Sequence, residues 1–180
     1  NIAEKDGRIR LIRSEKKSYG YQVNNGINQS RGEYILIVET DDYIMPQMCN
    51  TLYEYAKAYD LDFVKSDYFA YWVSKNGVRQ NIPRRVIRND MLYGKVICPN
   101  DYDEILVDDW YLWNGIYKRK FLTGNKILFS ETHGAAFQDI GFIFRTLVHA
   151  KRAMYVAVAA LLLSNNPVIS VNGNATALAC

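Results

Sequence analysis

A short apolar segment that ends in three carboxylates constrains the fold of this chain more than any other feature. Residues Ile35–Val38 form a continuous apolar run of strand length, and Glu39, Asp41 and Asp42 follow it directly. A strand that is apolar at every position is typical of a sheet covered by helices on both faces. The carboxylates would then lie at the carboxyl end of a strand, where open α/β sheets bind their ligands.

The segments around this strand predict an alternation of helices and strands. Val23 and Ile27 share a helical face before it, and Pro46 begins a second helix that continues to about Tyr59. The remaining pattern predicts strands at 8–12, 61–69, 113–117 and 154–163, a hairpin of 71–73 with 78–82, and helices at 99–106, 118–122 and 137–150. This order predicts an α/β fold with a mostly parallel sheet flanked by helices.

Composition excludes several classes of protein. Of the 180 residues, 49% are hydrophobic and 23% are charged, which is typical of a folded globular chain. The net charge of +3 is too small to indicate a nucleic-acid partner. The longest apolar run, 154–163, is far shorter than the roughly 20 residues that span a bilayer. Three cysteines without paired spacing argue against a disulfide framework and against a cysteine zinc site.

The acidic cluster after the apolar run suggests a metal site. Three carboxylates within four residues repel one another unless a cation or solvent relieves them. Oxygen ligands on a turn suit Mg²⁺ or Mn²⁺, which proteins commonly share with the phosphates of a substrate. The alternative is a solvated acidic turn that leads into a helix, whose N-terminus favours negative charge. The residues alone leave both interpretations open.

Several motifs in a fixed order resemble glycosyltransferase family 2, the inverting enzymes with a GT-A fold. The motifs are Asn24-Asn25-Gly26, Gly32-Glu33-Tyr34-Ile35, Glu39-Thr40-Asp41-Asp42, Trp113-Asn114 with Tyr117-Lys118-Arg119, and Gln138-Asp139. Their order and spacing match from about Arg8 to Tyr155, with a further likeness to the branch that makes bacterial polysaccharide and lipopolysaccharide. The resemblance implies a Rossmann-like GT-A domain at 1–156 that lacks its first βαβ unit, followed by a C-terminal segment at 157–180 of undefined structure.

The same resemblance implies a reaction and a set of site residues. The reaction is the transfer of a sugar, with inversion, from a nucleotide-sugar donor, UDP-linked by preference, to a saccharide or lipid-linked acceptor. The implied residues are Asp139 as the catalytic base, Asp41 and Asp42 as ligands of Mn²⁺ or Mg²⁺, Glu39, Asn24 and Gln22 around the nucleotide, and Trp113, Asn114 and His133 against the acceptor or donor sugar. A glycosyltransferase of this kind is expected in the cytoplasm, at the inner face of the membrane, and the resemblance allows peripheral membrane association and a homodimer.

Two other functions remain open at this point. Val23 stands where the family has an arginine and Glu39 where it has an aspartate, which favours a non-catalytic module that binds a nucleotide sugar or a partner. A metal-dependent phosphotransfer enzyme would also end its strands in aspartate. Such an enzyme needs a glycine-rich phosphate loop after a strand, and the sequence offers none.

Overall fold

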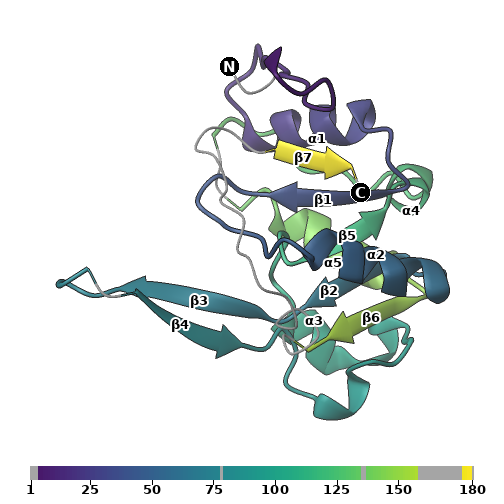
Figure 1. The fold of residues 1–180 in the computed structure, drawn as a ribbon. Coiled ribbons are helices and arrows are strands. Elements are labelled where there is room, and N and C mark those ends of the chain that lie inside the picture. Colours follow the sequence, from purple (N-terminus) through teal and green to yellow (C-terminus); the bar gives the residue numbers. More distant parts are fainter. Residues whose placement is uncertain (1–3, 78, 135–136, 158–175, 180) are drawn as a thin grey trace.

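A five-stranded sheet lies at the centre of the computed structural model, which describes residues 4–77, 79–134, 137–157 and 176–179 (Figure 1). The strands lie in the order β6-β2-β5-β1-β7. Their bounds are β1 Tyr34–Val38, β2 Phe63–Ser66, β5 Gly115–Lys118, β6 Ala153–Val156 and β7 Thr176–Ala179. The predicted α/β architecture is therefore confirmed.

The directions of the strands differ from the expected mostly parallel pairing. Strand β5 pairs antiparallel with both β1 and β2, and β7 pairs antiparallel with β1. Only β2 and β6 are direct parallel neighbours. Strands β1, β2 and β6 nevertheless run in the same direction, because β5 is inserted between two of them. The carboxyl ends of these three strands therefore lie at one edge of the sheet.

Helices cover both faces of the sheet, as the apolar run of β1 predicts. The helices are α1 Tyr19–Gln29, α2 Met48–Ala58, α3 Asp103–Asp108, α4 Arg119–Gly124 and α5 Ile140–His149, with 3-10 turns η2 Asp90–Leu92 and η3 Pro99–Asp101. Ile35 and Ile37 of β1 pack with α1 and α5, and Leu36 packs with Leu52 of α2. Within the described ranges, no helix combines the length and the apolar character needed to cross a bilayer.

Three predicted strands have different bounds in the structure. Residues 8–12 form no strand, because the segment pairs with none of the described strands and Leu11 is 70% exposed. The segment 61–69 divides at Asp67 into β2 and the first strand of the hairpin. Strand β6 ends at Val156, and residues 158–163 of that prediction lie outside the described part of the chain.

The predicted hairpin forms and projects from the body of the molecule. Its strands are β3 Tyr68–Val73 and β4 Arg79–Arg84, which pair with each other as a separate two-stranded sheet. The base of the hairpin is fixed, because the Asp67 carboxylate accepts hydrogen bonds from the Val86 N–H at 3.0 Å and from the Tyr93 hydroxyl. Figure 1 shows the two strands extending away from the central sheet.

Candidate functional site

The acidic loop follows β1 at the edge where β1, β2 and β6 end. A turn in which the Asp42 N–H donates to the Glu39 carbonyl at 3.1 Å brings the acidic side chains close together. Burial raises the pKa of Asp42 to about 6, and the negative charges of Asp41 and Glu39 add to this effect. The loop thus concentrates negative charge in a partly desolvated place, as the sequence predicts for residues that would accept a cation.

Asp139 lies close to this loop, although the two are about a hundred residues apart in sequence. Burial raises the pKa of the half-buried Glu39, and the carboxylates of Asp41 and Asp139 raise it further. Asp139 occupies the position before α5, but its side chain makes no capping hydrogen bond to that helix. A capping role for α5 therefore does not explain the presence of the Asp139 carboxylate at this position. The predicted base and the predicted metal ligands share one region.

Tyr19, at the start of α1, lies between these acidic groups, and sequence reasoning missed it. Burial raises its pKa far above the usual value, and the charges of Glu39, Asp139 and Asp42 act in the same direction. The phenol therefore remains protonated, and its buried hydroxyl has no hydrogen-bond partner in the described structure. The ring of Tyr19 packs edge-on against Phe129, with ring centroids 5.8 Å apart. The only signal in the sequence was a high tyrosine content, with 14 tyrosines among 180 residues.

Gln138 fastens the segment that carries Asp139 to the N-terminus of α1. Its Oε1 accepts from the Gly20 N–H at 2.5 Å, and its Nε2 donates to the carbonyl and hydroxyl of Thr132 at 2.6 and 2.8 Å. Only 2% of this side chain is exposed. Gly20 cannot be replaced freely here, since an added Cβ would lie 1.9 Å from the Ser130 carbonyl oxygen. Gln138 therefore positions its neighbour Asp139.

Replacing Gln138 with Leu is expected to lower the free energy of unfolding by about 1–3 kcal/mol, because the buried Gly20 N–H and the Thr132 carbonyl lose their partner. Urea denaturation followed by circular dichroism measures this cost. Gln29→Leu is the matched control, since Gln29 is an exposed glutamine on α1 whose side chain bonds only to Asn25 in the described structure. It should change stability by no more than about 0.5 kcal/mol. Equal costs for the two variants would contradict the positioning role of Gln138.

Asn24, which the resemblance places around the nucleotide, is buried and bonds to the segment at Phe129. Its Nδ2 donates to the Phe129 carbonyl and to Glu131, both at 3.0 Å, and its Oδ1 accepts from the Phe129 N–H at 2.8 Å. The side chain is 3% exposed, so its amide is used to hold α1 against the segment at Phe129. Gln22, on the same helix, is half-buried. His133 is exposed, next to Gly134, whose backbone pairs with Lys17 and Tyr19.

Trp113 and Asn114 lie before β5, where Trp113 contacts the base of the hairpin and Asn114 contacts the end of β2. The rings of Trp113 and Tyr111 pack against Tyr68, with centroids 5.0 and 4.8 Å from it. Tyr71 of the same strand donates a 3.4 Å hydrogen bond to the Asp41 carbonyl, so β3 contacts both the Trp113 segment and the acidic loop. Asn114 donates to the Ser66 carbonyl at 2.8 Å, while its buried Oδ1 has no partner in the described structure.

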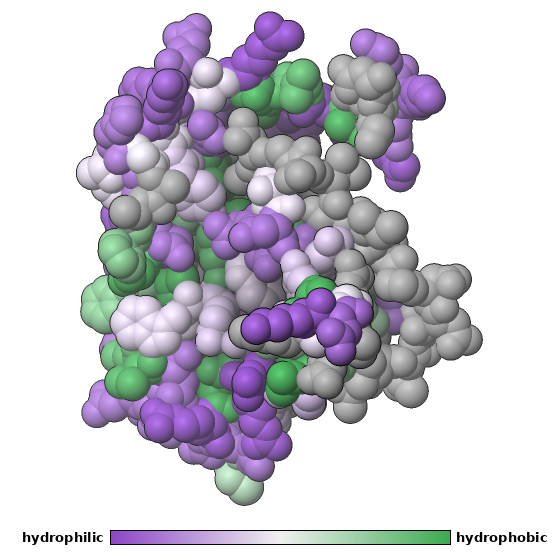
Figure 2. Space-filling view, turned by 90° about the vertical axis from the view of Figure 1, so that its left-hand side faces the viewer, coloured by the Kyte–Doolittle hydropathy of each residue, from purple (hydrophilic) through white to green (hydrophobic). Residues whose placement is uncertain are grey.

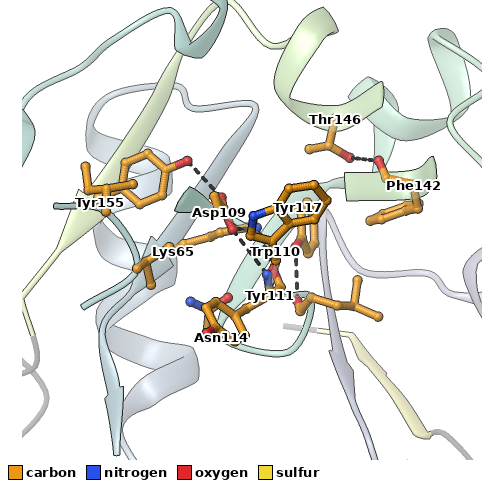
Figure 3. A network of polar contacts seen from close by, with 12 residues as sticks. Lys65, Asp109, Trp110, Tyr111, Asn114, Tyr117, Phe142, Thr146 and Tyr155 are labelled. Carbon is orange, nitrogen blue, oxygen red and sulfur yellow. Dashed lines mark hydrogen bonds and ion pairs between the residues drawn. The ribbon is translucent and has the colours of Figure 1, made fainter. Parts of the chain in front are cut away.

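A buried polar network supports the segment that carries Trp113 (Figure 3). The Lys65 ammonium lies 2.7 Å from the Asp109 carboxylate and donates to the Tyr111 carbonyl at 2.6 Å. Tyr155 donates to the other oxygen of Asp109 at 2.8 Å. Both side chains of the ion pair are at most 1% exposed. Burial lowers the pKa of Lys65, and the Asp109 charge opposes that shift. The only signal in the sequence was a lysine directly after the apolar pair Phe63-Val64 in a predicted strand.

The described part of the chain contains no group of three or more His, Cys, Asp or Glu side chains arranged to hold a metal ion. Mg²⁺ is usually held by one or two carboxylates together with substrate phosphates.

A family model described as glycosyl transferase family 2 matches residues 1–138. A second model, described as phosphopantothenate/pantothenate synthetase, matches residues 149–180. The 4-phosphopantoate–beta-alanine ligase of Thermococcus onnurineus is 40% identical over 72 residues, which cover 37% of this chain and 28% of the relative. The two family models thus match separate parts of the chain, the first ending before α5 and the second beginning at the last residue of α5.

Curated relatives extend the first of these similarities over most of the chain. The glycosyltransferase EpsJ of Bacillus subtilis is 26% identical over 173 residues, which cover 93% of this chain and 48% of the relative. The glycosyltransferase YibD of Escherichia coli is 27% identical over 157 residues, covering 85% and 44%. The chain therefore spans about half the length of these relatives.

Solved structures show the same fold. The crystal structure of S. aureus TarS residues 1–349 in complex with UDP superimposes with a TM-score of 0.58 at 17% identity, covering 78% of this chain and 38% of that chain. The complex of the same protein with UDP-GlcNAc gives a TM-score of 0.57, covering 82% and 38%.

Proposed function

Because the chain belongs to glycosyl transferase family 2, we propose that it forms the catalytic region of an enzyme that transfers a sugar, with inversion, from a UDP-linked donor to a glycan or lipid-linked acceptor. The observation that carries this proposal is the convergence of the acidic loop and Asp139 on one partly buried region. The UDP and UDP-GlcNAc complexes of TarS support the choice of donor. The polypeptide would act in the cytoplasm, at the inner face of the membrane.

Inversion requires that the acceptor attack from the face opposite the leaving group. In the proposed reaction, Asp139 takes the proton from the acceptor hydroxyl as its oxygen bonds to the anomeric carbon, and the bond to the nucleoside diphosphate breaks. The carboxylate is available for this role, because it makes no capping hydrogen bond to α5. Gln138 holds it at the correct place relative to α1. Tyr19 and Glu39 form the adjoining wall of the site.

The residues of the acidic loop fit a divalent cation. Asp42 is held partly desolvated beside two further carboxylates, and a cation would remove the cost of that arrangement. Asp41 and Asp42 would hold the ion, and Glu39 would face the nucleotide. When bound, Mn²⁺ or Mg²⁺ supplies positive charge to the leaving diphosphate.

The double variant Asp41→Ala/Asp42→Ala is expected to weaken Mn²⁺-dependent binding of a UDP-sugar by at least about tenfold, because the ion loses its protein ligands. Isothermal titration with and without Mn²⁺ measures the effect. Asp101→Ala is the control, since Asp101 is exposed on the 3-10 turn η3. If Mn²⁺ increased donor affinity equally in the double variant and in the unaltered chain, the metal assignment would be wrong.

A non-catalytic nucleotide-sugar module is the second candidate, and Val23 favours it. This residue stands where the family has an arginine, and it is 3% exposed within the core, so it cannot reach a nucleotide. A thermal-shift screen against nucleotide sugars, followed by a transfer assay on each donor that binds, separates the candidates. A donor that binds without transfer to any glycan or lipid-linked acceptor would favour the module.

A further inference from the structure

The projecting hairpin carries basic side chains and no acidic one. Between Asp67 and Asp90 the sequence has five basic residues and no acidic one. The rest of the chain has 17 basic and 19 acidic residues. Two of the five, Arg85 and Arg88, form ion pairs with Asp90 and Asp108 at the base. The others are Lys75, Arg79 and Arg84, of which Lys75 and Arg84 are exposed. The net charge of the hairpin itself is therefore about equal to that of the whole chain.

Apolar side chains are exposed on the same hairpin. Val73 is 51% exposed, Tyr71 44% and Ile82 39%. In the register of the two strands, Ala70 lies opposite Ile82 and Tyr71 lies opposite Asn81. Since directly opposed residues share a face and neighbours alternate, Tyr71 and Ile82 belong to opposite faces of the hairpin. In Figure 2 the hairpin points toward the viewer, and hydrophilic side chains at its end lie beside hydrophobic ones.

The position of the hairpin relates it to the candidate site. Its base is fixed to the body through Asp67, whereas its outer part extends away from the sheet (Figure 1). Tyr71 packs edge-on against Tyr43 at 5.6 Å between ring centroids, and it hydrogen-bonds to the Asp41 carbonyl. A surface bound by the hairpin would therefore lie close to the acidic loop.

We propose that the β3–β4 hairpin docks the protein onto an anionic lipid bilayer, with Lys75 and Arg84 at the headgroups and Val73 and Ile82 in the interface. Basic side chains gain free energy near anionic headgroups, and burial of apolar side chains in the interface adds to this gain. This inference rests on the hairpin alone and is independent of the transfer reaction.

The distribution of the apolar side chains favours a bilayer over two other partners. A protein partner would cover one face of the hairpin, whereas lipid surrounds an inserted hairpin on both faces. A soluble polyanion would need the cations but would gain nothing from Val73 and Ile82. The combination of cations without acids and exposed apolar side chains therefore favours an anionic bilayer.

Flotation with vesicles tests the docking. The full chain is mixed with vesicles of phosphatidylcholine alone or with added phosphatidylglycerol, and the bound fraction is measured. We expect binding to the anionic vesicles only, and a loss of at least about tenfold in the partition coefficient for Lys75→Glu/Arg84→Glu. The control Lys120→Glu/Lys151→Glu makes the same charge change at exposed positions on α4 and before β6, away from the hairpin (Figure 1), and should lose less than about threefold.

A second pair of variants tests insertion. Val73→Ser/Ile82→Ser keeps every charge and is expected to reduce binding to the anionic vesicles by about tenfold or more. Its binding to soluble polyphosphate should be unchanged. The docking inference is overturned if the unaltered chain fails to bind anionic vesicles, if both charge variants lose binding equally, or if the serine variant binds vesicles as well as the unaltered chain. Thermal melting checks that each variant is folded.

Discussion

Replacing Asp139 with Asn is expected to reduce sugar transfer by about 10²–10⁴-fold while leaving the affinity for the donor nearly unchanged. Asparagine has the size and shape of aspartate but cannot accept the proton of the acceptor hydroxyl. The side chain makes no capping hydrogen bond to α5, so the change should cost little stability. The loss should therefore appear in the rate of transfer, and not in folding or in donor binding.

The experiment compares single-turnover transfer with donor binding by titration, both on the full-length protein. Asp101→Asn serves as the control, because it makes the same chemical change at an exposed position on η3. A variant at Asp139 that lost donor affinity and transfer in the same proportion would contradict the role of a base. Such a result would favour a role in binding the donor, through the negative potential that Asp139 shares with Glu39.

The sequence predicted those elements whose cause is local. The apolar run Ile35–Val38 requires a strand covered on both faces, and the structure buries it between α1 and α2. The Lys75-Asn76-Gly77 turn predicted the hairpin, and Gly77 has the positive φ that such a turn requires. From the order of the motifs we predicted that Asp139 and the acidic loop belong to one site, and in the structure Asp139 lies close to Glu39 of that loop.

The elements that the sequence did not predict depend on distant partners. The direction of β5 depends on its place in the sheet. No local sequence pattern shows whether a strand lies antiparallel between two others or parallel at the edge of the sheet. The segment 8–12 has the alternation of a strand, but a strand also needs a neighbour that offers its backbone. Asn24 resembles a site residue by its motif, yet its amide is used by Phe129, about a hundred residues later in the chain.

The ion pair of Lys65 with Asp109 illustrates the same limit and carries the largest expected effect on stability. Lys65 lies in β2 and Asp109 follows α3, 44 residues later. Removing one charge leaves the other buried and unpaired, which typically costs 3–5 kcal/mol. We therefore expect Asp109→Leu and Lys65→Met each to lower the free energy of unfolding by about 3–5 kcal/mol, measured by urea denaturation.

The double variant Lys65→Met/Asp109→Leu distinguishes the loss of the pair from the cost of an orphaned charge. The double variant buries no charge, so it has no desolvation penalty from an unpaired ion. It should therefore lower the free energy of unfolding by less than either single variant does. Tyr155 and the Tyr111 carbonyl then lose one partner each, so some cost remains. Lys57→Met is the control, because Lys57 pairs with Glu33 at 3.0 Å on the surface, with 49% and 43% of the two side chains exposed. It should cost at most about 1 kcal/mol.

The outcome also bears on the candidate site, because the Lys65 ammonium holds the Tyr111 carbonyl and Trp113 lies two residues further on. If the network positions that segment, the double variant remains folded but binds the sugar acceptor more weakly, while Mn²⁺-dependent donor binding through Asp41 and Asp42 is retained. Additive costs of the two single changes would mean that the charges do not interact. Unchanged acceptor affinity in a stable double variant would restrict the network to a role in folding.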